Sequence, residues 1–226
     1  MIAATPTSSP RVKPKLRGVS HQIAFFVALV ACAFLVATVK GPRAVFACAV
    51  YGLSLSALFG ISALYHRPMW SPEKRALLRR ADHSAIYIFI AGTYTPLCLL
   101  AIPEAAGLRM LVITWTFAVF GVAKELLWPG APRWITTVVF LVMGWVGASS
   151  SKDLYDSMGL RGVIMFLTAG VLYSTGAIIY ARKRPDPLPA VFGYHEIFHL
   201  LVIAAAALHY VAITQFVWGL QSRLIG

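Results

Sequence analysis

Long apolar runs separated by short polar stretches dominate the chain. Each run has close to the roughly 20 residues that a helix needs to cross the hydrocarbon layer of a bilayer. Because a segment in lipid must satisfy its own backbone hydrogen bonds, each run is expected to be helical. The pattern predicts an all-α membrane protein with seven transmembrane helices, at roughly His21–Thr38, Ala44–Tyr65, His83–Ile102, Leu108–Leu126, Trp134–Ser150, Gly162–Ala181 and Ile197–Leu220.

The boundaries of the predicted domain follow from breaks in this pattern. Residues 1–20 are polar and contain prolines and basic residues, without the short apolar core of a cleavable signal. We predict a disordered cytoplasmic tail there and one transmembrane domain over 21–226. Between the fourth and fifth runs, Pro129-Gly130-Ala131-Pro132 is a breaker cluster that predicts a turn.

Composition agrees with a membrane protein and excludes a soluble one. Hydrophobic residues make up 59% of the chain and charged residues 12%, whereas soluble domains carry about 25% charged residues. The formal net charge is +12. Because the basic residues lie between apolar runs, anionic lipid head groups are favoured over nucleic acid as partners. Cys32, Cys48 and Cys98 fall inside apolar runs and form no disulfide frame or zinc-finger pattern.

Basic residues are distributed unevenly between the two ends of the predicted spans. The N-terminal tail and every second loop after it carry most of the Lys and Arg residues, with a dense group over Arg67–Arg80. Cytoplasmic loops are enriched in Lys and Arg. The N-terminus is therefore predicted to be cytoplasmic, in a protein that is integral to the cytoplasmic (inner) membrane.

Five polar residues lie where three predicted spans begin or end. Ser62 and His66 are four residues apart at the end of the second span, Asp82 opens the third, and His195 and His199 open the seventh, again four apart. Residues four apart on a helix share a face. Under the predicted topology, all five reach the cytoplasmic leaflet.

These five residues suggest metal-assisted chemistry. Three imidazoles, from His66, His195 and His199, would bind zinc and leave a fourth position for water, whose pKa the metal lowers toward about 7. Asp82 would accept a hydrogen bond from that water or take its proton as general base. Ser62 would hydrogen-bond the water or an oxyanion. The alternative is that all five are polar groups at the membrane interface, with Asp82 paired to a neighbouring arginine.

The segment at His195 also fits the His-Glu-x-x-His pattern of zinc peptidases, where the glutamate is the general base. A metzincin would have a third histidine at position 205, where this chain has Ala205. We interpret Glu196 as a group that pairs with a basic loop residue and keep an intramembrane peptidase as an alternative. The other histidines are interpreted as structural: His209 as a buried polar contact, His83 as a hydrogen-bonded interface residue and His21 as a marker of the membrane surface.

Taken in order, these motifs resemble those of the hemolysin III proteins. The resemblance rests on Ser62-x-x-x-His66, on Asp82, and on His195-x-x-x-His199 followed by an apolar run to His209-Tyr210. Residues 92–96, Gly-Thr-Tyr-Thr-Pro, are similar to the bacterial branch. The hemolysin III proteins belong with the progestin and adipoQ receptors, which include the adiponectin receptors, and the resemblance covers nearly the whole chain.

This resemblance implies a seven-helix bundle with its N-terminus inside the cell. It implies a zinc ion held by His66, His195 and His199, with Asp82 and Ser62 near the zinc-bound water. The related alkaline ceramidases hydrolyse lipid amides with a similar set of residues.

We therefore expect an integral membrane zinc protein that hydrolyses an amide or ester bond of a membrane lipid near the cytoplasmic leaflet. Membrane lipids and a lipid substrate are the expected partners. The second hypothesis is non-enzymatic: a receptor-like sensor of membrane lipid state in which zinc is structural. A pore-forming cytolysin has the least support, because no continuous polar face runs along several spans.

Overall fold

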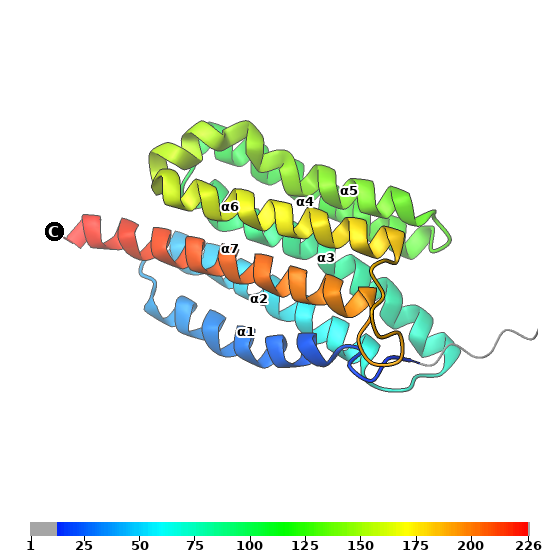
Figure 1. The fold of residues 1–226 in the computed structure, drawn as a ribbon. Coiled ribbons are helices and arrows are strands. Elements are labelled where there is room, and N and C mark those ends of the chain that lie inside the picture. Colours follow the sequence, from blue (N-terminus) through cyan, green and yellow to red (C-terminus); the bar gives the residue numbers. More distant parts are fainter. Residues whose placement is uncertain (1–12, 226) are drawn as a thin grey trace, which may run out of the picture.

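The computed structural model of the protein describes residues 13–225, which are helical apart from turns, connections and one isolated β-bridge between Leu188 and Phe192. The helices lie side by side along one direction (Figure 1). They are α1 (Val19–Thr38), α2 (Pro42–His66), α3 (Pro72–Leu100), α4 (Glu104–Leu127), α5 (Arg133–Trp145), the short 3-10 helix η1 (Val146–Ser150), α6 (Ser151–Arg182) and α7 (Tyr194–Ile225).

Six helical segments of the described chain are long and apolar enough to cross a membrane. Five of them correspond to α1, α2, α3, α4 and α7, and the sixth is a 49-residue stretch from Trp134 to Arg182. A straight helix of that length would extend roughly 70 Å, more than twice the thickness of about 30 Å of a hydrocarbon core. The prediction of an all-α, multi-pass membrane protein is confirmed.

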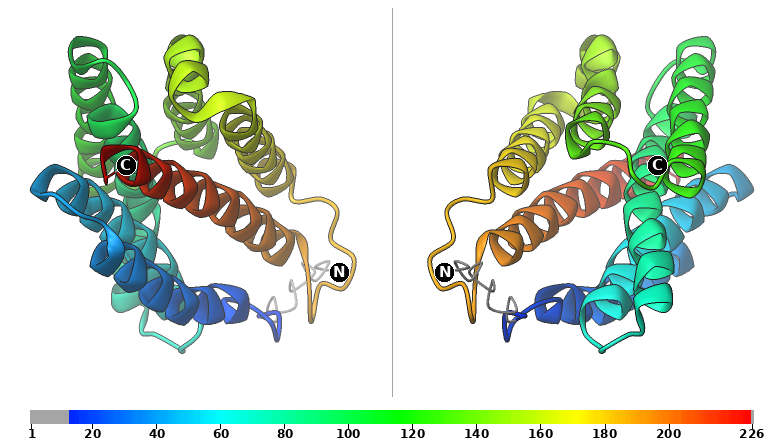
Figure 2. Two further views of the ribbon diagram at one scale, coloured as in Figure 1. Left: turned by 90° about the vertical axis from the view of Figure 1, so that its left-hand side faces the viewer. Right: turned by 90° about the vertical axis from the view of Figure 1, so that its right-hand side faces the viewer.

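The long stretch turns back on itself at Gly159. Its backbone there has φ 69° and ψ 179°, a combination that essentially only glycine adopts. Figures 1 and 2 show α5 and α6 as two arms joined at one end. The apolar pattern predicted a connection over 151–161, whereas the helix resumes at Ser151 and continues to the turn.

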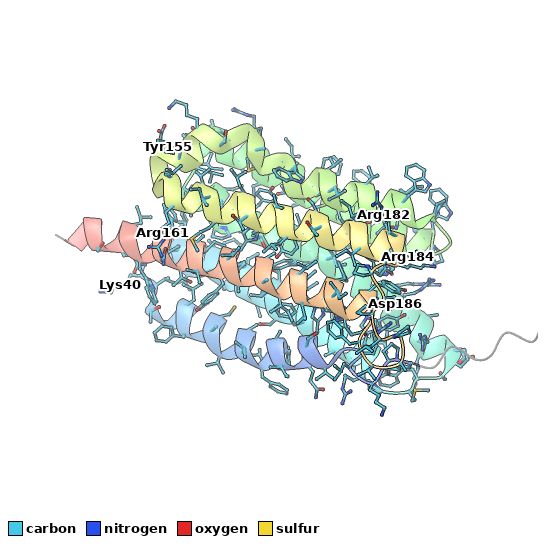
Figure 3. The ribbon with its side chains drawn as sticks, in the orientation of Figure 1. Lys40, Tyr155, Arg161, Arg182, Arg184 and Asp186 are labelled. Atoms are coloured by element: carbon cyan, nitrogen blue, oxygen red, sulfur yellow. The ribbon has the colours of Figure 1, made fainter. Side chains whose placement is uncertain are left out.

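Charged side chains gather at the two ends of the helices. Lys40 and Arg161 lie toward one end, and Arg182, Arg184 and Asp186 toward the other (Figure 3). The second end also holds the tail segment from Lys13 and the α2–α3, α4–α5 and α6–α7 connections (Figure 1). We call it the tail end.

The core lies between α2, α3 and their neighbours. α2 packs along both α1 and α3, α4 packs along α3, and α6 packs along α7. Tyr51 and Tyr87 are completely buried, while large apolar residues such as Phe26 and Leu53 face outward. Outward apolar side chains suit a lipid environment, and the inner surface brings the tail ends of α2, α3 and α7 to one place.

Replacing Gly159 by alanine should destabilise the protein. The added Cβ would meet no neighbouring atom, so the cost is backbone strain of about 1–3 kcal/mol. The control is Gly144→Ala in α5, which also has open space around its Cβ but helical backbone, where alanine is favoured. Thermal unfolding of the purified protein should show a lower midpoint for Gly159→Ala alone; equal midpoints would contradict the strained turn.

Candidate metal centre

The structure brings His66, His195 and His199 together at the tail end. His66 is the last residue of α2, and His195 and His199 lie in the first two turns of α7. One ring nitrogen from each lies within 4.8 Å of the others, and the Nε2 atoms of His66 and His195 are 3.1 Å apart. All three side chains are buried.

This arrangement fits a metal ion. Tetrahedral zinc with Zn–N distances of 2.0–2.1 Å needs ligand nitrogens about 3.3 Å apart, close to the separation of His66 and His195. The Nδ1 atom of His199 is buried without a hydrogen-bond partner, and an unpartnered buried polar atom is costly. The residues present can therefore hold a divalent cation.

Asp82 and Ser62 complete the cluster. The Oδ2 atom of Asp82 lies 3.8 Å from Nε2 of His66, and the Ser62 side chain lies near enough to the Asp82 carboxylate to interact with it. The alternative pairing of Asp82 with a neighbouring arginine is absent among the described ion pairs, and Arg79 instead donates to the Pro129 carbonyl (3.4 Å). All five predicted site residues thus lie together, and their chemical roles stay predictions.

Glu196 caps the start of α7. Its Oε2 accepts a hydrogen bond from the Gly193 backbone N–H (2.8 Å), and its Oε1 accepts one from Arg17 Nε (2.5 Å). A carboxylate at a helix N-terminus satisfies free N–H groups and interacts favourably with the helix dipole. Glu196 does pair with a basic residue, although that residue belongs to the tail. Both oxygens are engaged, which weakens the peptidase alternative.

The segment Lys13–Gly18 crosses the tail end beside the histidines, and we call it the strap. Its backbone donates from Lys15 to the Ala190 carbonyl (3.0 Å) and from Leu16 to the Val191 carbonyl (3.1 Å). Gly18 has φ 79°, and a Cβ added there would lie 2.6 Å from the Cβ of His66. Of the predicted disordered tail, residues 1–12 lie outside the described residues.

His21 was interpreted as a marker of the membrane surface, and this was wrong. It is 3% exposed and stacks on His199, with ring centroids 3.7 Å apart and planes at 7°. Its other ring neighbour is Phe59, edge-on at 5.1 Å. One available signal was that His21 opens the first predicted span at the same end of the bundle as the five polar residues of the predicted site.

The remaining two histidines have partners outside this cluster. His83 has its Nδ1 3.3 Å from Glu125 Oε2, in agreement with a hydrogen-bonded role, and Lys124 pairs with the same carboxylate. His209 stacks on Phe166 with centroids 4.6 Å apart. Ten residues, or about 15 Å along α7, separate it from His199.

Comparison with known proteins identifies the family. A family model described as Haemolysin-III related matches residues 10–210. The chain belongs to the hemolysin III family. Its relatives include hemolysin-3 from Bacillus cereus, which is 34% identical over 174 residues, covering 77% of this chain and 76% of that protein.

Two further relatives, one bacterial and one from an animal, show sequence similarity to this hemolysin III protein. The hemolysin-3 homolog of Bacillus subtilis (strain 168) is 31% identical over 192 residues, covering 84% of this chain and 87% of that protein. The adiponectin receptor protein of Drosophila melanogaster is 26% identical over 173 residues, covering 69% of this chain and 39% of the receptor. The resemblance inferred from the motifs is confirmed.

The contact between the strap and His66 leads to a test. Gly18→Ala should displace His66, lowering both the thermal midpoint and the metal retained after purification. Gly41→Ala is the matched control, because Gly41 also has positive φ (87°) before a helix but has no atom near its added Cβ. Metal analysis and thermal unfolding of both variants measure the difference. Equal metal retention would mean that the strap does not position His66.

Proposed function

We propose that this hemolysin III protein is a zinc-dependent hydrolase that cleaves an amide or ester bond of a membrane lipid at the cytoplasmic leaflet. The observation that carries the proposal is the buried cluster of three imidazoles with Asp82 and Ser62 beside it. Three protein ligands leave a coordination position open, which is typical of catalytic rather than structural zinc sites.

Zinc, when bound, would polarise a carbonyl and make water acidic enough to react near neutral pH. Asp82 is placed to take the proton of the attacking water, because its carboxylate borders His66. Ser62 lies near that carboxylate, and its hydroxyl would help to orient Asp82 or donate to an oxyanion. Burial of the cluster limits competing bulk water.

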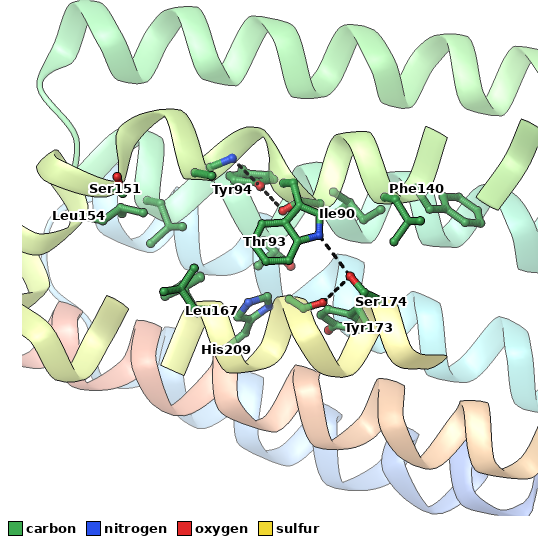
Figure 4. Close-up of a pocket in the computed structure, with 18 of the residues that line it drawn as sticks. Ile90, Thr93, Tyr94, Phe140, Ser151, Leu154, Leu167, Tyr173, Ser174 and His209 are labelled. Carbon is green, nitrogen blue, oxygen red and sulfur yellow. Dashed lines mark hydrogen bonds between the residues drawn. The ribbon is translucent and has the colours of Figure 1, made fainter. Parts of the chain in front are cut away.

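A cavity of about 110 Å³ supports a lipid substrate. It lies between α3, α5, α6 and α7 and is lined mainly by apolar side chains, including Ile90, Phe140 and Leu167, with His209 at one wall (Figure 4). The distance of about 15 Å along α7 from His199 to His209 is half of the roughly 30 Å hydrocarbon core. An acyl chain could therefore reach the cavity from a head group at the tail end.

The proposal includes a topology of seven spans with a cytoplasmic N-terminus, in the cytoplasmic membrane. The turn at Gly159 supports two crossings by the 49-residue stretch. The strap and the α2–α3, α4–α5 and α6–α7 connections share one end (Figure 1). Their many Lys and Arg residues support a cytoplasmic position for this end.

A second candidate function is a lipid sensor with a structural metal. The three histidines come from α2 and α7 only, and α2 packs mainly on α1 and α3 while α7 packs mainly on α6. A metal ion would therefore link two helices that share little other contact. Such a link would stabilise the fold, as structural zinc does.

Metal content is the first test of both functions. We expect about one zinc ion per chain in the wild type and its loss in His195→Ala plus His199→Ala, because two of three ligands are removed. Mass spectrometry of purified protein provides the measurement, and His209→Ala controls for removal of a buried histidine outside the cluster. A wild type free of metal would rule out both functions.

Substitution of Asp82 distinguishes the hydrolase from the lipid sensor. Asp82→Asn should lower turnover of lipid amides and esters by about a hundredfold or more, the usual effect of removing a general base, with metal content unchanged. Asp153→Asn, in α6 at the opposite end, is the control. Full turnover in Asp82→Asn would exclude Asp82 as the base. If chelator lowers the unfolding midpoint but no lipid turnover is detected, the structural role is favoured.

A further inference from the structure

Three basic residues lie near one another beside the metal centre, close enough for both arginines to act electrostatically on the lysine. They are Lys13 of the strap, Arg67 directly after α2, and Arg75 in the first turn of α3, and we call them the basic mouth. Lys13 Nζ donates to the Arg67 carbonyl (2.9 Å). The Arg75 guanidinium lies 5.9 Å from the centre of the Tyr65 ring, which itself contacts the ring of His66 at 4.4 Å.

No carboxylate balances the basic mouth among the ion pairs of the described residues. Arg67 donates instead to the neutral side-chain amide of Gln22 (2.9 Å). Partial burial lowers the pKa of the Lys13 ammonium below its ordinary value, and neighbouring guanidinium groups lower it further. These groups belong to Arg67, Arg75 and Arg17.

A bound metal would increase this excess of positive charge. Three neutral imidazoles contribute no negative charge, so a divalent ion on them adds two positive charges. Among the residues that the structure describes, Asp82 is the carboxylate that forms an ion-pair contact with the histidine cluster, whereas Glu196 pairs with Arg17. The charges of Lys13, Arg17 and Arg75 act electrostatically on His66. Lys13 is half-buried and Arg67 and Arg75 are exposed, and an uncompensated cluster of positive charge at a surface attracts an anion.

We propose that Lys13, Arg67 and Arg75 bind the phosphate group of the ligand that reaches the metal centre. The proposal rests on the proposed hydrolase and narrows its substrate from any membrane lipid with an amide or ester bond to one that also carries a phosphate ester. Guanidinium groups bind phosphate oxygens in pairs, and an ammonium adds a point charge.

The position of the basic mouth agrees with a phospholipid. Arg67 and Arg75 flank the polar connection between two membrane-spanning helices, the depth at which basic residues meet lipid head groups. A phosphate held there would leave the ester carbonyls of the same lipid next to the three histidines. The basic mouth would thus set both the choice of lipid and the position of its scissile bond.

The test measures thermal unfolding of the purified full chain, by tryptophan fluorescence, during titration with three probes. Dioctanoyl phosphatidylglycerol carries the phosphate, dioctanoylglycerol has the same chains without it, and sodium phosphate, against sodium chloride at equal ionic strength, supplies the free anion. The test variant is Lys13→Gln with Arg67→Gln and Arg75→Gln. The matched control, Lys15→Gln with Lys74→Gln and Lys183→Gln, removes three exposed charges from the same end.

We expect the phosphatidylglycerol probe to raise the unfolding midpoint of the wild type and the control, and dioctanoylglycerol to have no such effect. The test variant should need at least tenfold more phosphatidylglycerol to reach the same rise in its unfolding midpoint, since each basic residue near a membrane surface contributes about fivefold in affinity. Arg75→Gln alone should show a partial loss, and it guards against misfolding of the triple variant. A response to sodium phosphate that depends on the same residues would show that the free anion suffices.

The phosphate site would be overturned if the control variant lost as much of the phosphatidylglycerol-induced shift as the test variant. It would also be overturned if dioctanoylglycerol raised the wild-type midpoint as much as phosphatidylglycerol does. Metal content of the same samples keeps the two proposals apart. Metal at about one ion per chain without any phosphate-dependent shift would overturn the phosphate site alone. A phosphate-dependent shift in a wild type that carries no metal would overturn the hydrolase and leave phosphate recognition standing.

Discussion

Ionisable groups at membrane depth are costly unless they find partners inside the protein. In this hemolysin III protein, that constraint gathers imidazoles and a carboxylate at the tail ends of α1, α2, α3 and α7. His21 stacks on His199, Asp82 borders His66, and Glu196 is taken up by Arg17. One ring nitrogen each of His66, His195 and His199 lies within 4.8 Å of the others, which is an arrangement that a cation would satisfy.

The tail end is closed by contacts between segments that are distant in sequence. The strap bonds to the α6–α7 connection through two backbone hydrogen bonds, and Arg17 reaches the capping carboxylate of α7. Only glycine fits at position 18, because the Cβ of any other residue would overlap the Cβ of His66. The strap, Lys13–Gly18, is therefore part of the wall of the site.

Helix periodicity and the distribution of basic residues were enough to predict that Ser62, His66, Asp82, His195 and His199 meet, because spans fix which residues share a leaflet and a face. The burial of His21 was not predictable from its apolar surroundings, since an opening residue of a span can face lipid, water or protein. Neither was the partner of Glu196, which depends on where the strap folds. The predicted connection over 151–161 contains the turn at Gly159, but the structure is helical on both sides of that glycine. The local sequence therefore located the turn only approximately.

The spacing of the histidines along the chain has a consequence for biosynthesis. His66 and His195 are 129 residues apart in sequence, so α2 enters the membrane long before the ribosome has produced α7. Until then, His66 has neither of its imidazole neighbours. The three histidines meet only when α7 inserts, so a metal bound there would report that α7 has been made and brought to α2.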